Sequence, residues 1–354
     1  MIFNWHPKIC RCSAPRAAER SSTRRGCRWK LPAGLALVWL AFCASSAAAQ
    51  SLKVPFAALS PNYAPLWIAD QTGLFKKHGL DVQLIYISAG SVIVPAILSG
   101  QVDIANMSSA PALTAWARGA ELSAVGVTSN RLLHVIMTRS SIKTPQELKN
   151  KKIGGDRYGS LSDLILREAL RYYNLVPDRD VAVIQTGGLP ERLGALKAGA
   201  VDGAIVTGDT ALEAERLGFH KLIDLGQLPI RYPSSTIIVS KSFLTAKRDT
   251  VKRFLRGWIE GIKIAKTDKE TTISVMRKFL KTGDRSVLER IFEIYKSVHE
   301  RVPTPDPKLM GVALKQLAAN VPQTHQLKVE DFTDGSLIAE LQSEGFIDKV
   351  YNGR

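Results

Sequence analysis

Short apolar runs alternate with helical patterns along residues 50–210 of this chain. The runs typical of strands are residues 52–59, 81–87, 102–107, 152–155, 181–185 and 201–206. Apolar positions at helical spacing predict helices over 64–77, 92–98, 162–173 and 192–197, and one more that begins after Ser108-Ser109 and ends at Gly119. Strands that alternate with helices in this way predict a parallel α/β architecture.

Two segments 99 residues apart repeat one another, LSGQVDIA at 98–105 and KAGAVDGA at 197–204. The same offset aligns Lys53-Val54 with Lys152-Ile153 and Asp81-Val82 with Asp180-Val181. A constant offset across three segments predicts an internal duplication and therefore two similar lobes. The alternative is a chance likeness between α/β units.

Two extended segments predict how the two lobes connect. Extended segments near 132–138 and 235–240 predict two crossings between the lobes, which together make a hinge. We expect residues 50–135 and 236–354 to form the first lobe and residues 136–235 the second. Two later stripes at helical spacing predict helices that pack against the first lobe: Val251, Phe254, Leu255, Trp258, Ile259 and Ile262, then Val287, Leu288, Ile291, Phe292 and Tyr295.

Residues 1–49 have the pattern of an export signal. Eight Lys and Arg residues precede an apolar stretch at 31–42, and Ala47-Ala48-Ala49 forms a cleavage site before Gln50. Twin-arginine export through Thr23-Arg24-Arg25 stays open beside the ordinary secretory route. An uncleaved anchor and a lipoprotein at Cys43 are further alternatives, but the apolar stretch is short for a membrane span. We expect a periplasmic mature chain that starts near Gln50.

Charge and cysteine content narrow the function classes. Residues 1–49 hold eight basic residues and one acidic residue. The net charge is therefore +16 for the whole chain and +9 for residues 50–354. A basic exported surface favours small anionic ligands or an anionic membrane face over nucleic acid, and a solvated surface that keeps the protein soluble is the simplest explanation of the charge. All four cysteines lie in 1–49, and the later histidines are scattered, so we expect no disulfide, no metal site and no cofactor.

Ligands of open parallel sheets bind at the carboxyl ends of the strands, so the turns after the predicted strands are where we expect a site. In the first lobe these turns hold small, polar and aromatic residues suited to a ligand lining: Ser60, Asn62, Tyr63, Trp67, Ser88, Gly90, Ser91, Ser108 and Ser109. For Trp67 the alternative is packing beneath its helix. For Ser108 and Ser109 it is helix capping.

The corresponding turns of the second lobe contribute Arg157, Tyr158, Gly159, Ser160, Ser162, Gly188, Thr207 and Asp209. Arg157 is predicted to hold a carboxylate or sulfonate through two parallel hydrogen bonds, the alternative being a solvated side chain. Asp209 is predicted to receive an amine or to pair with Arg157. His134 and Tyr232, near the predicted hinge, complete the candidate set, and a structural role is the alternative for His134.

Three segments carry a resemblance to a known family: NYAPLWIA at 62–69, GLFKKHGLDV at 73–82 and SGQVDIA at 99–105. The chain resembles the substrate-binding proteins of ABC importers of the nitrate, sulfonate and taurine type, also called NMT1/THI5-like. The resemblance implies a type II periplasmic binding protein fold whose two lobes close on a ligand about a hinge. It also implies a monomer that is no enzyme, and that delivers its solute to a membrane permease driven by a cytoplasmic ATPase.

Arg157, the serine-rich turns and the positive charge lead us to expect a small organic anion as the ligand: a sulfonate, a carboxylate, or a nitrate-like or pyrimidine-type solute. Two other functions stay open. A periplasmic sensor or docking protein needs the same cleft, so the sequence does not separate it from transport. A metabolic enzyme on this fold is the second, as in thiamine-pyrimidine synthesis, but those synthases carry a cysteine-rich motif and this chain has no cysteine after residue 49.

Overall fold

The computed structural model describes residues 51–318 and 327–353. The predicted export signal at 1–49 lies outside the described residues. Every described element belongs to one compact unit, Ala49–Arg354. None of the helices in the described ranges is long and apolar enough to cross a lipid bilayer.

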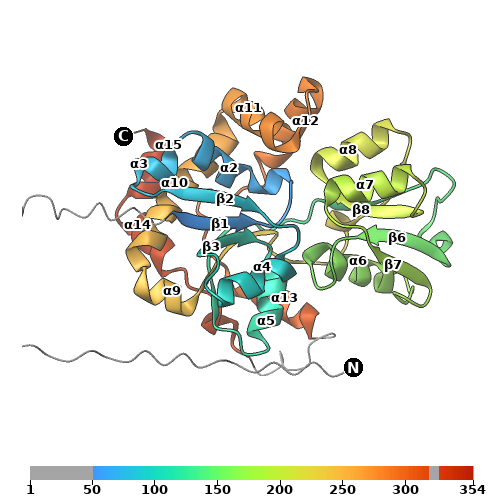
Figure 1. Cartoon of the computed structure of the whole chain (residues 1–354), viewed down its shortest axis with the longest axis horizontal. Coiled ribbons are helices and arrows are strands. Elements are labelled where there is room, and N and C mark those ends of the chain that lie inside the picture. The colour runs from blue at the N-terminus through green and yellow to red at the C-terminus, as the bar shows by residue number, and fades with distance from the viewer. Residues whose placement is uncertain (1–50, 319–326, 354) are drawn as a thin grey trace, which may run out of the picture. The chain divides into compact units, whose positions relative to one another are not determined.

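Two five-stranded mixed sheets form the framework of this unit (Figure 1). The strands are β1 (Leu52–Phe56), β2 (Val82–Tyr86), β3 (Ile104–Met107), β4 (Leu122–Ser129), β5 (His134–Thr138), β6 (Lys151–Gly155), β7 (Val181–Gln185), β8 (Gly203–Thr207), β9 (His220–Asp224) and β10 (Ser235–Ser240). The first sheet has the order β2-β1-β3-β10-β4 and the second β7-β6-β8-β5-β9. One strand in each, β10 and β5, runs antiparallel to its neighbours. The expected α/β architecture is confirmed, and each sheet is mixed rather than fully parallel because of this one strand.

The repeat in the sequence is also a repeat in sheet register. Strands β6, β7 and β8 each begin 99 residues after β1, β2 and β3. In the first sheet Leu52 pairs with Val82, and in the second Lys151 pairs with Val181, at the same offset. Both lobes therefore bring the turns after their three parallel strands to the same edge of their sheet.

The two predicted crossing segments are strands rather than free connections. Residues 134–138 form β5, which lies inside the second sheet, and residues 235–240 form β10, which lies inside the first. The connections that run from sheet to sheet are the short segments 130–133 and 228–234. A strand explains the apolar pattern of both segments, because each is buried between two neighbouring strands.

The helices cover both faces of each sheet (Figure 1). They are α2 (Ala64–Gln71), α3 (Leu74–Lys77), α4 (Gly90–Leu98), α5 (Ser109–Trp116), α6 (Leu161–Tyr172), α7 (Leu189–Lys197), α8 (Gly208–Arg216), α9 (Lys241–Ala246), α10 (Arg248–Thr267), α11 (Lys269–Leu280), α12 (Arg285–Tyr295), α13 (Pro307–Leu317), α14 (Ser336–Ser343) and α15 (Phe346–Asn352), with short 3-10 turns at 61–63, 145–148, 225–227 and 329–331. The helix predicted over 64–77 is two helices, because Gly73 takes a left-handed conformation with φ of 74° between them.

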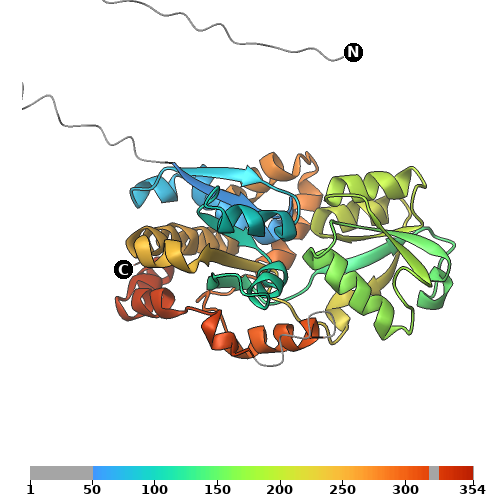
Figure 2. The ribbon, with the colours of Figure 1, turned by 60° about the horizontal axis from the view of Figure 1, so that its bottom comes forward.

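Helix α10 lies beside α2 and α3 in the first lobe (Figure 2). It packs against α2 and α3, as its apolar stripe predicts, and Phe254, Trp258 and Ile262 on that stripe are fully buried. The side chain of Phe75 on α3 stacks on Phe254 with ring centroids 4.8 Å apart. The segment that returns from the second lobe therefore supplies part of the core of the first lobe. The carboxyl ends of the parallel strands stay available to form a site.

Candidate functional site

A cavity of about 50 Å³ lies where the parallel strands of both sheets end. Its lining combines the two lobes: Ala57, Ala58, Ser60, Asn62, Tyr63, Ala89, Gly90, Ser108, His134, Asp156, Ser160, Leu161, Ser162, Leu189, Arg192, Thr207 and Ser234. Because a cavity needs roughly 10–15 Å³ of this volume for each water, it holds on the order of four water-sized groups. The space suits a compact polar molecule.

Nine of the residues predicted from the sequence line this cavity: Ser60, Asn62, Tyr63, Gly90, Ser108, His134, Ser160, Ser162 and Thr207. Several stand at the N-termini of helices that follow the strands. Ser60 and Ser160 use their hydroxyls as caps, accepting from the backbone N–H of Asn62 and Asp163 at 3.5 and 3.2 Å. Ser108 is the N-cap of α5 but makes no side-chain cap bond, so its hydroxyl stays available to the cavity.

Three predicted residues belong to the protein interior instead. Trp67 is fully buried and stacks on Phe279, with ring centroids 4.5 Å apart and planes at 1°. Ser109 donates to the backbone oxygen of Pro233 at 3.4 Å. The Tyr232 hydroxyl donates to Glu168 on α6 at 2.5 Å. Of the two roles proposed for Trp67, packing is the one found.

Other predicted residues are not part of the cavity lining. Ser91, Tyr158 and Gly159 line a separate surface groove together with residues of α4, α5 and α6. The side chain of Tyr158 is 70% exposed and lies under the guanidinium of Arg167. Gly188 is the N-cap of α7. Asp209 lies in α8, and its side chain is not among those that the structure describes.

The structure places Arg157 outside the lining of this cavity. Arg157 is exposed and does not line the cavity; only its backbone N–H approaches the site, donating to Asp156 Oδ1 at 2.8 Å. Successive side chains at the end of a strand point to opposite sides. Asp156, the residue directly after β6, is 4% exposed and lines the cavity, so its neighbour faces solvent.

The charged residues in the lining are Asp156 and Arg192, and sequence reasoning missed both. Arg192 on α7 is 2% exposed, and its Nη2 donates to Asp156 Oδ2 at 3.3 Å. It also donates to the backbone oxygens of Gly187, Gly188 and Ile205 at 2.8 to 3.3 Å. A signal existed, because Arg192 shares helical spacing with the buried residues 189, 193 and 196.

The other polar groups of the cavity are neutral. Burial, reinforced by the charge on Arg192, lowers the pKa of His134 to about 3, so its imidazole carries no charge at neutral pH. Burial raises the pKa of the Tyr63 phenol above its ordinary value, so the phenol keeps its proton. Asn62 Oδ1 and His134 Nδ1 have no hydrogen-bond partner within 51–318 and 327–353. Both are free to meet a bound molecule.

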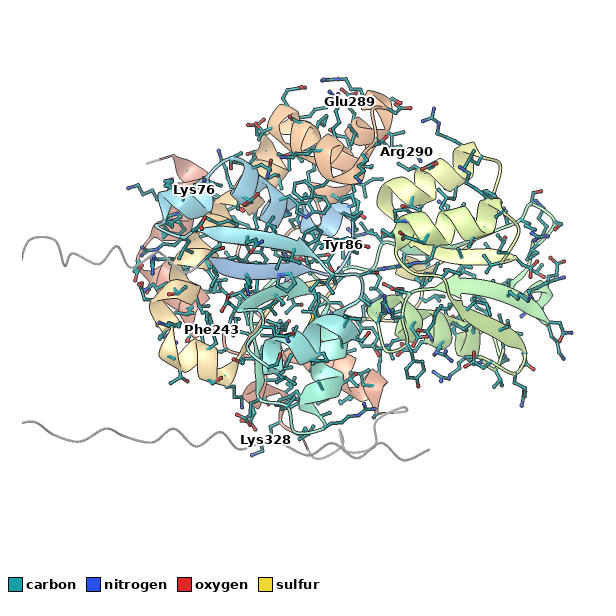
Figure 3. The ribbon with its side chains drawn as sticks, in the orientation of Figure 1. Lys76, Tyr86, Phe243, Glu289, Arg290 and Lys328 are labelled. Carbon is teal, nitrogen blue, oxygen red and sulfur yellow. The ribbon has the colours of Figure 1, made fainter. Side chains whose placement is uncertain are left out.

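Contacts across the cavity hold the two lobes together. Ser88, after β2, donates its hydroxyl to Asp156 Oδ1 at 3.3 Å. The hydroxyls of Thr207 and Tyr295 lie 3.2 Å apart and share a hydrogen bond. Tyr86, at the end of β2, faces the second lobe (Figure 3), and a Cβ on Gly188 would lie 2.6 Å from its hydroxyl oxygen. Gly188 therefore permits a close approach of the two lobes.

The Tyr232–Glu168 hydrogen bond joins the returning connection to α6 and gives a pH prediction. Burial raises the pKa of Glu168 to about 7, from an ordinary value of 4.5, and the bond from Tyr232 offsets this in part. Between these pH values the folded state keeps a proton that the unfolded state has lost, so this contribution to stability falls as pH rises. Relative to Glu168→Gln, the unsubstituted protein should lose stability between pH 5 and pH 8 in urea unfolding.

The comparison with the variant is needed because two histidines act in the opposite direction. Burial lowers the pKa of His134 and His299 to about 3, so their contribution to stability rises with pH. Both histidines are present in Glu168→Gln, so they cancel in the difference. Parallel stability–pH curves for the two proteins would contradict the assignment of a raised pKa to Glu168.

Comparison with known proteins places this chain in a family. The NMT1/THI5-like family model matches residues 60–271. The putative binding protein YtlA of Bacillus subtilis is 25% identical over an alignment of 277 residues, and the match covers 75% of this chain and 81% of YtlA. A pyrimidine phosphate synthase of Aspergillus parasiticus is 31% identical, but the match spans 35% of this chain and 36% of the synthase.

Solved structures share the fold at low identity. The periplasmic nitrate-binding protein NrtA of Synechocystis aligns with a TM-score of 0.70 at 16% identity, covering 85% of this chain and 90% of NrtA. The alkanesulfonate-binding protein SsuA of Xanthomonas axonopodis aligns with a TM-score of 0.64 at 18% identity, covering 82% and 96%. These likenesses concern the fold.

Proposed function

Because the chain belongs to the NMT1/THI5-like family, we propose that it is the solute-binding protein of an ABC importer. It takes up a small solute between its lobes in the periplasm and presents the closed complex to a membrane permease coupled to a cytoplasmic ATPase. It acts as a monomer and performs no chemistry on the solute. The observation that carries the proposal is the polar cavity shared by the carboxyl edges of both sheets.

The architecture of the lining supports binding of an acidic group. Residues at or beside the N-termini of α4, α5, α6, α7 and α8 all line the cavity. Backbone N–H groups and the helix dipole make such termini favourable for negative charge. Arg192 adds a buried guanidinium. The acidic ligand class therefore keeps its support although Arg157 lies outside the cavity.

The cavity also supports capture coupled to closure. Ser88 and Asp156 come from different lobes and meet beside the cavity. A solute that contacts both lobes favours the closed arrangement over the open one by its differential affinity. A permease that recognises surfaces from both lobes then distinguishes the loaded protein from the empty one. A sensor would use the same closure, and an adjacent permease gene would favour transport.

The test is a thermal-shift and calorimetric screen of the polypeptide 49–354, which contains the whole compact unit. The panel covers carboxylates, sulfonates, nitrate, bicarbonate and pyrimidines, each with and without an amino group. We expect at least one solute to raise the melting temperature, because binding to the folded state stabilises it by mass action. Absence of any stabilisation, or turnover of a bound solute, would refute the proposal.

Arg157 supplies the matched control for this screen. Arg157→Ala removes an exposed guanidinium next to the site, whereas Asn62→Ala removes an amide whose oxygen has no partner among the described residues. We expect Asn62→Ala to weaken binding of the identified solute more than tenfold and Arg157→Ala to leave it within about twofold.

A further inference from the structure

The one buried ion pair in the cavity lining, Asp156 with Arg192, is an unusual feature for a site that binds an acid. Both side chains are almost fully buried, and they lie 3.3 Å apart. The guanidinium suits an acidic ligand, but the carboxylate repels one. A site for a simple anion gains nothing from Asp156, whereas a carboxylate in the lining is a strong acceptor for a protonated amine.

The hydrogen bonds of the pair leave capacity on both partners. A guanidinium has five N–H groups. Nε–H donates to the carbonyls of Gly187 and Gly188, Nη1 to that of Ile205, and Nη2 to Asp156. One N–H on Nη1 and one on Nη2 therefore have no acceptor among the described residues, and Arg192 lines the cavity. These two N–H groups are the donors that Arg192 has left for an acidic group.

The same count applies to the carboxylate. An ionised carboxylate offers about four acceptor positions. Oδ1 receives the hydroxyl of Ser88 and the backbone N–H of Arg157, and Oδ2 receives Arg192. One position on Oδ2 remains. The amide oxygen of Asn62 is a second acceptor in the lining without a partner among the described residues. The cavity therefore holds unused acceptors as well as unused donors.

The net charge of the cavity lining also favours a ligand that carries both an acidic group and an amine. Asp156 and Arg192 neutralise each other, and His134 is uncharged at neutral pH, so the charges of the described lining sum to zero. A bare anion leaves one uncompensated negative charge in a buried space, apart from what the helix N-termini supply. A zwitterion adds no net charge and meets one partner of the pair at each end.

Resting on the proposed function, we propose that the solute is a small zwitterion, an amino carboxylate whose acid meets Arg192 and the helix N-termini and whose ammonium group meets Asp156. The size of the cavity, on the order of four water-sized groups, points to a molecule near glycine or β-alanine. Asp156 is then the residue that makes the site prefer an amine-bearing acid over the same acid without it.

The experiment compares pairs of solutes that differ only in the amino group. Glycine is paired with acetate and β-alanine with propionate, and dissociation constants are measured by calorimetry on the polypeptide 49–354. We expect the amino member of at least one pair to bind more than tenfold tighter. Asp156→Asn should reduce that preference to less than threefold, because the amide keeps the shape and removes the charge.

Asp163→Asn is the control for a structural effect. Asp163 is 1% exposed and lies in the same lobe, but it pairs with Arg167 and is not part of the cavity lining. This variant should keep the amine preference. If Asp156→Asn does not fold, Asp156→Ser is used, which also removes the carboxylate and should reduce the preference in the same way.

The outcomes separate the two proposals. Equal or tighter binding of acetate and propionate, or an amine preference that survives in Asp156→Asn, overturns the zwitterion assignment and leaves the binding function intact. Stabilisation in the wider screen by simple anions or pyrimidines alone does the same. Failure of every solute in the wider screen overturns the binding function itself.

Discussion

Replacing Arg192 with alanine should lower the free energy of unfolding by about 3–5 kcal/mol, the range for removing one partner of a buried ion pair. The substitution leaves Asp156 charged in a site where it is 4% exposed. It also removes the donor to the carbonyls of Gly187, Gly188 and Ile205. Through these hydrogen bonds Arg192 connects the N-terminus of α7 to β8. Losing them therefore weakens the packing of the second lobe.

Urea unfolding measures the effect, and two variants make it specific. Arg157→Ala, at the exposed neighbouring position, should change the free energy of unfolding by less than about 0.5 kcal/mol. Arg192→Ala combined with Asp156→Asn should be more stable than Arg192→Ala alone, because the stranded charge is gone. A double variant no more stable than the single one would show that the carbonyl bonds, and not the ion pair, make Arg192 important.

Gly261→Ala should destabilise the protein by about 3 kcal/mol, although alanine is the better helix former. Gly261 lies in α10 where that helix crosses α2, and a Cβ there would overlap the backbone oxygen of Pro65 and lie 3.2 Å from the Cβ of Ala69. A backbone oxygen cannot rotate away, so the two helices must separate. The core of the first lobe would loosen along their contact.

Gly194→Ala is the matched control, since Gly194 is also in a helix but has no atom within 4 Å of a built Cβ. There the gain in helix propensity should stabilise by about 0.5–1 kcal/mol. Thermal and urea unfolding of both variants give the comparison. Equal effects at the two positions would mean that α10 and α2 do not pack as closely as described.

Periodicity and repetition in the sequence predicted most of the fold. The 99-residue offset reappears as equal starts of β1, β2 and β3 with β6, β7 and β8. The strands β4 and β9 and the strand character of the two crossings were missed. Their place in a sheet is set by pairing with strands distant in sequence, such as β10 with β4. Periodicity within one segment carries no information on such pairing.

The candidate site was predicted in part for the same reason. Turns after parallel strands converge by topology, so Ser60, Asn62, Ser108 and Thr207 reach the cavity as expected. Within a turn, neighbouring residues can point to opposite sides, so a shift of one position decides which side chain enters the cavity. The chain places Asp156 inward and Arg157 outward, which reverses the charge expected at that position.

The sequence by itself determined the two-lobed α/β plan, the edge of each sheet where a ligand site lies, and the family. These follow from patterns local to each segment and from their repetition. Only the tertiary structure decided the chemistry of the cavity. Asp156 and Arg192 lie 36 positions apart and become partners because β6 and α7 meet in space. Helical spacing places Arg192 on the buried face of α7, but no local pattern of residues identifies Asp156 as its partner.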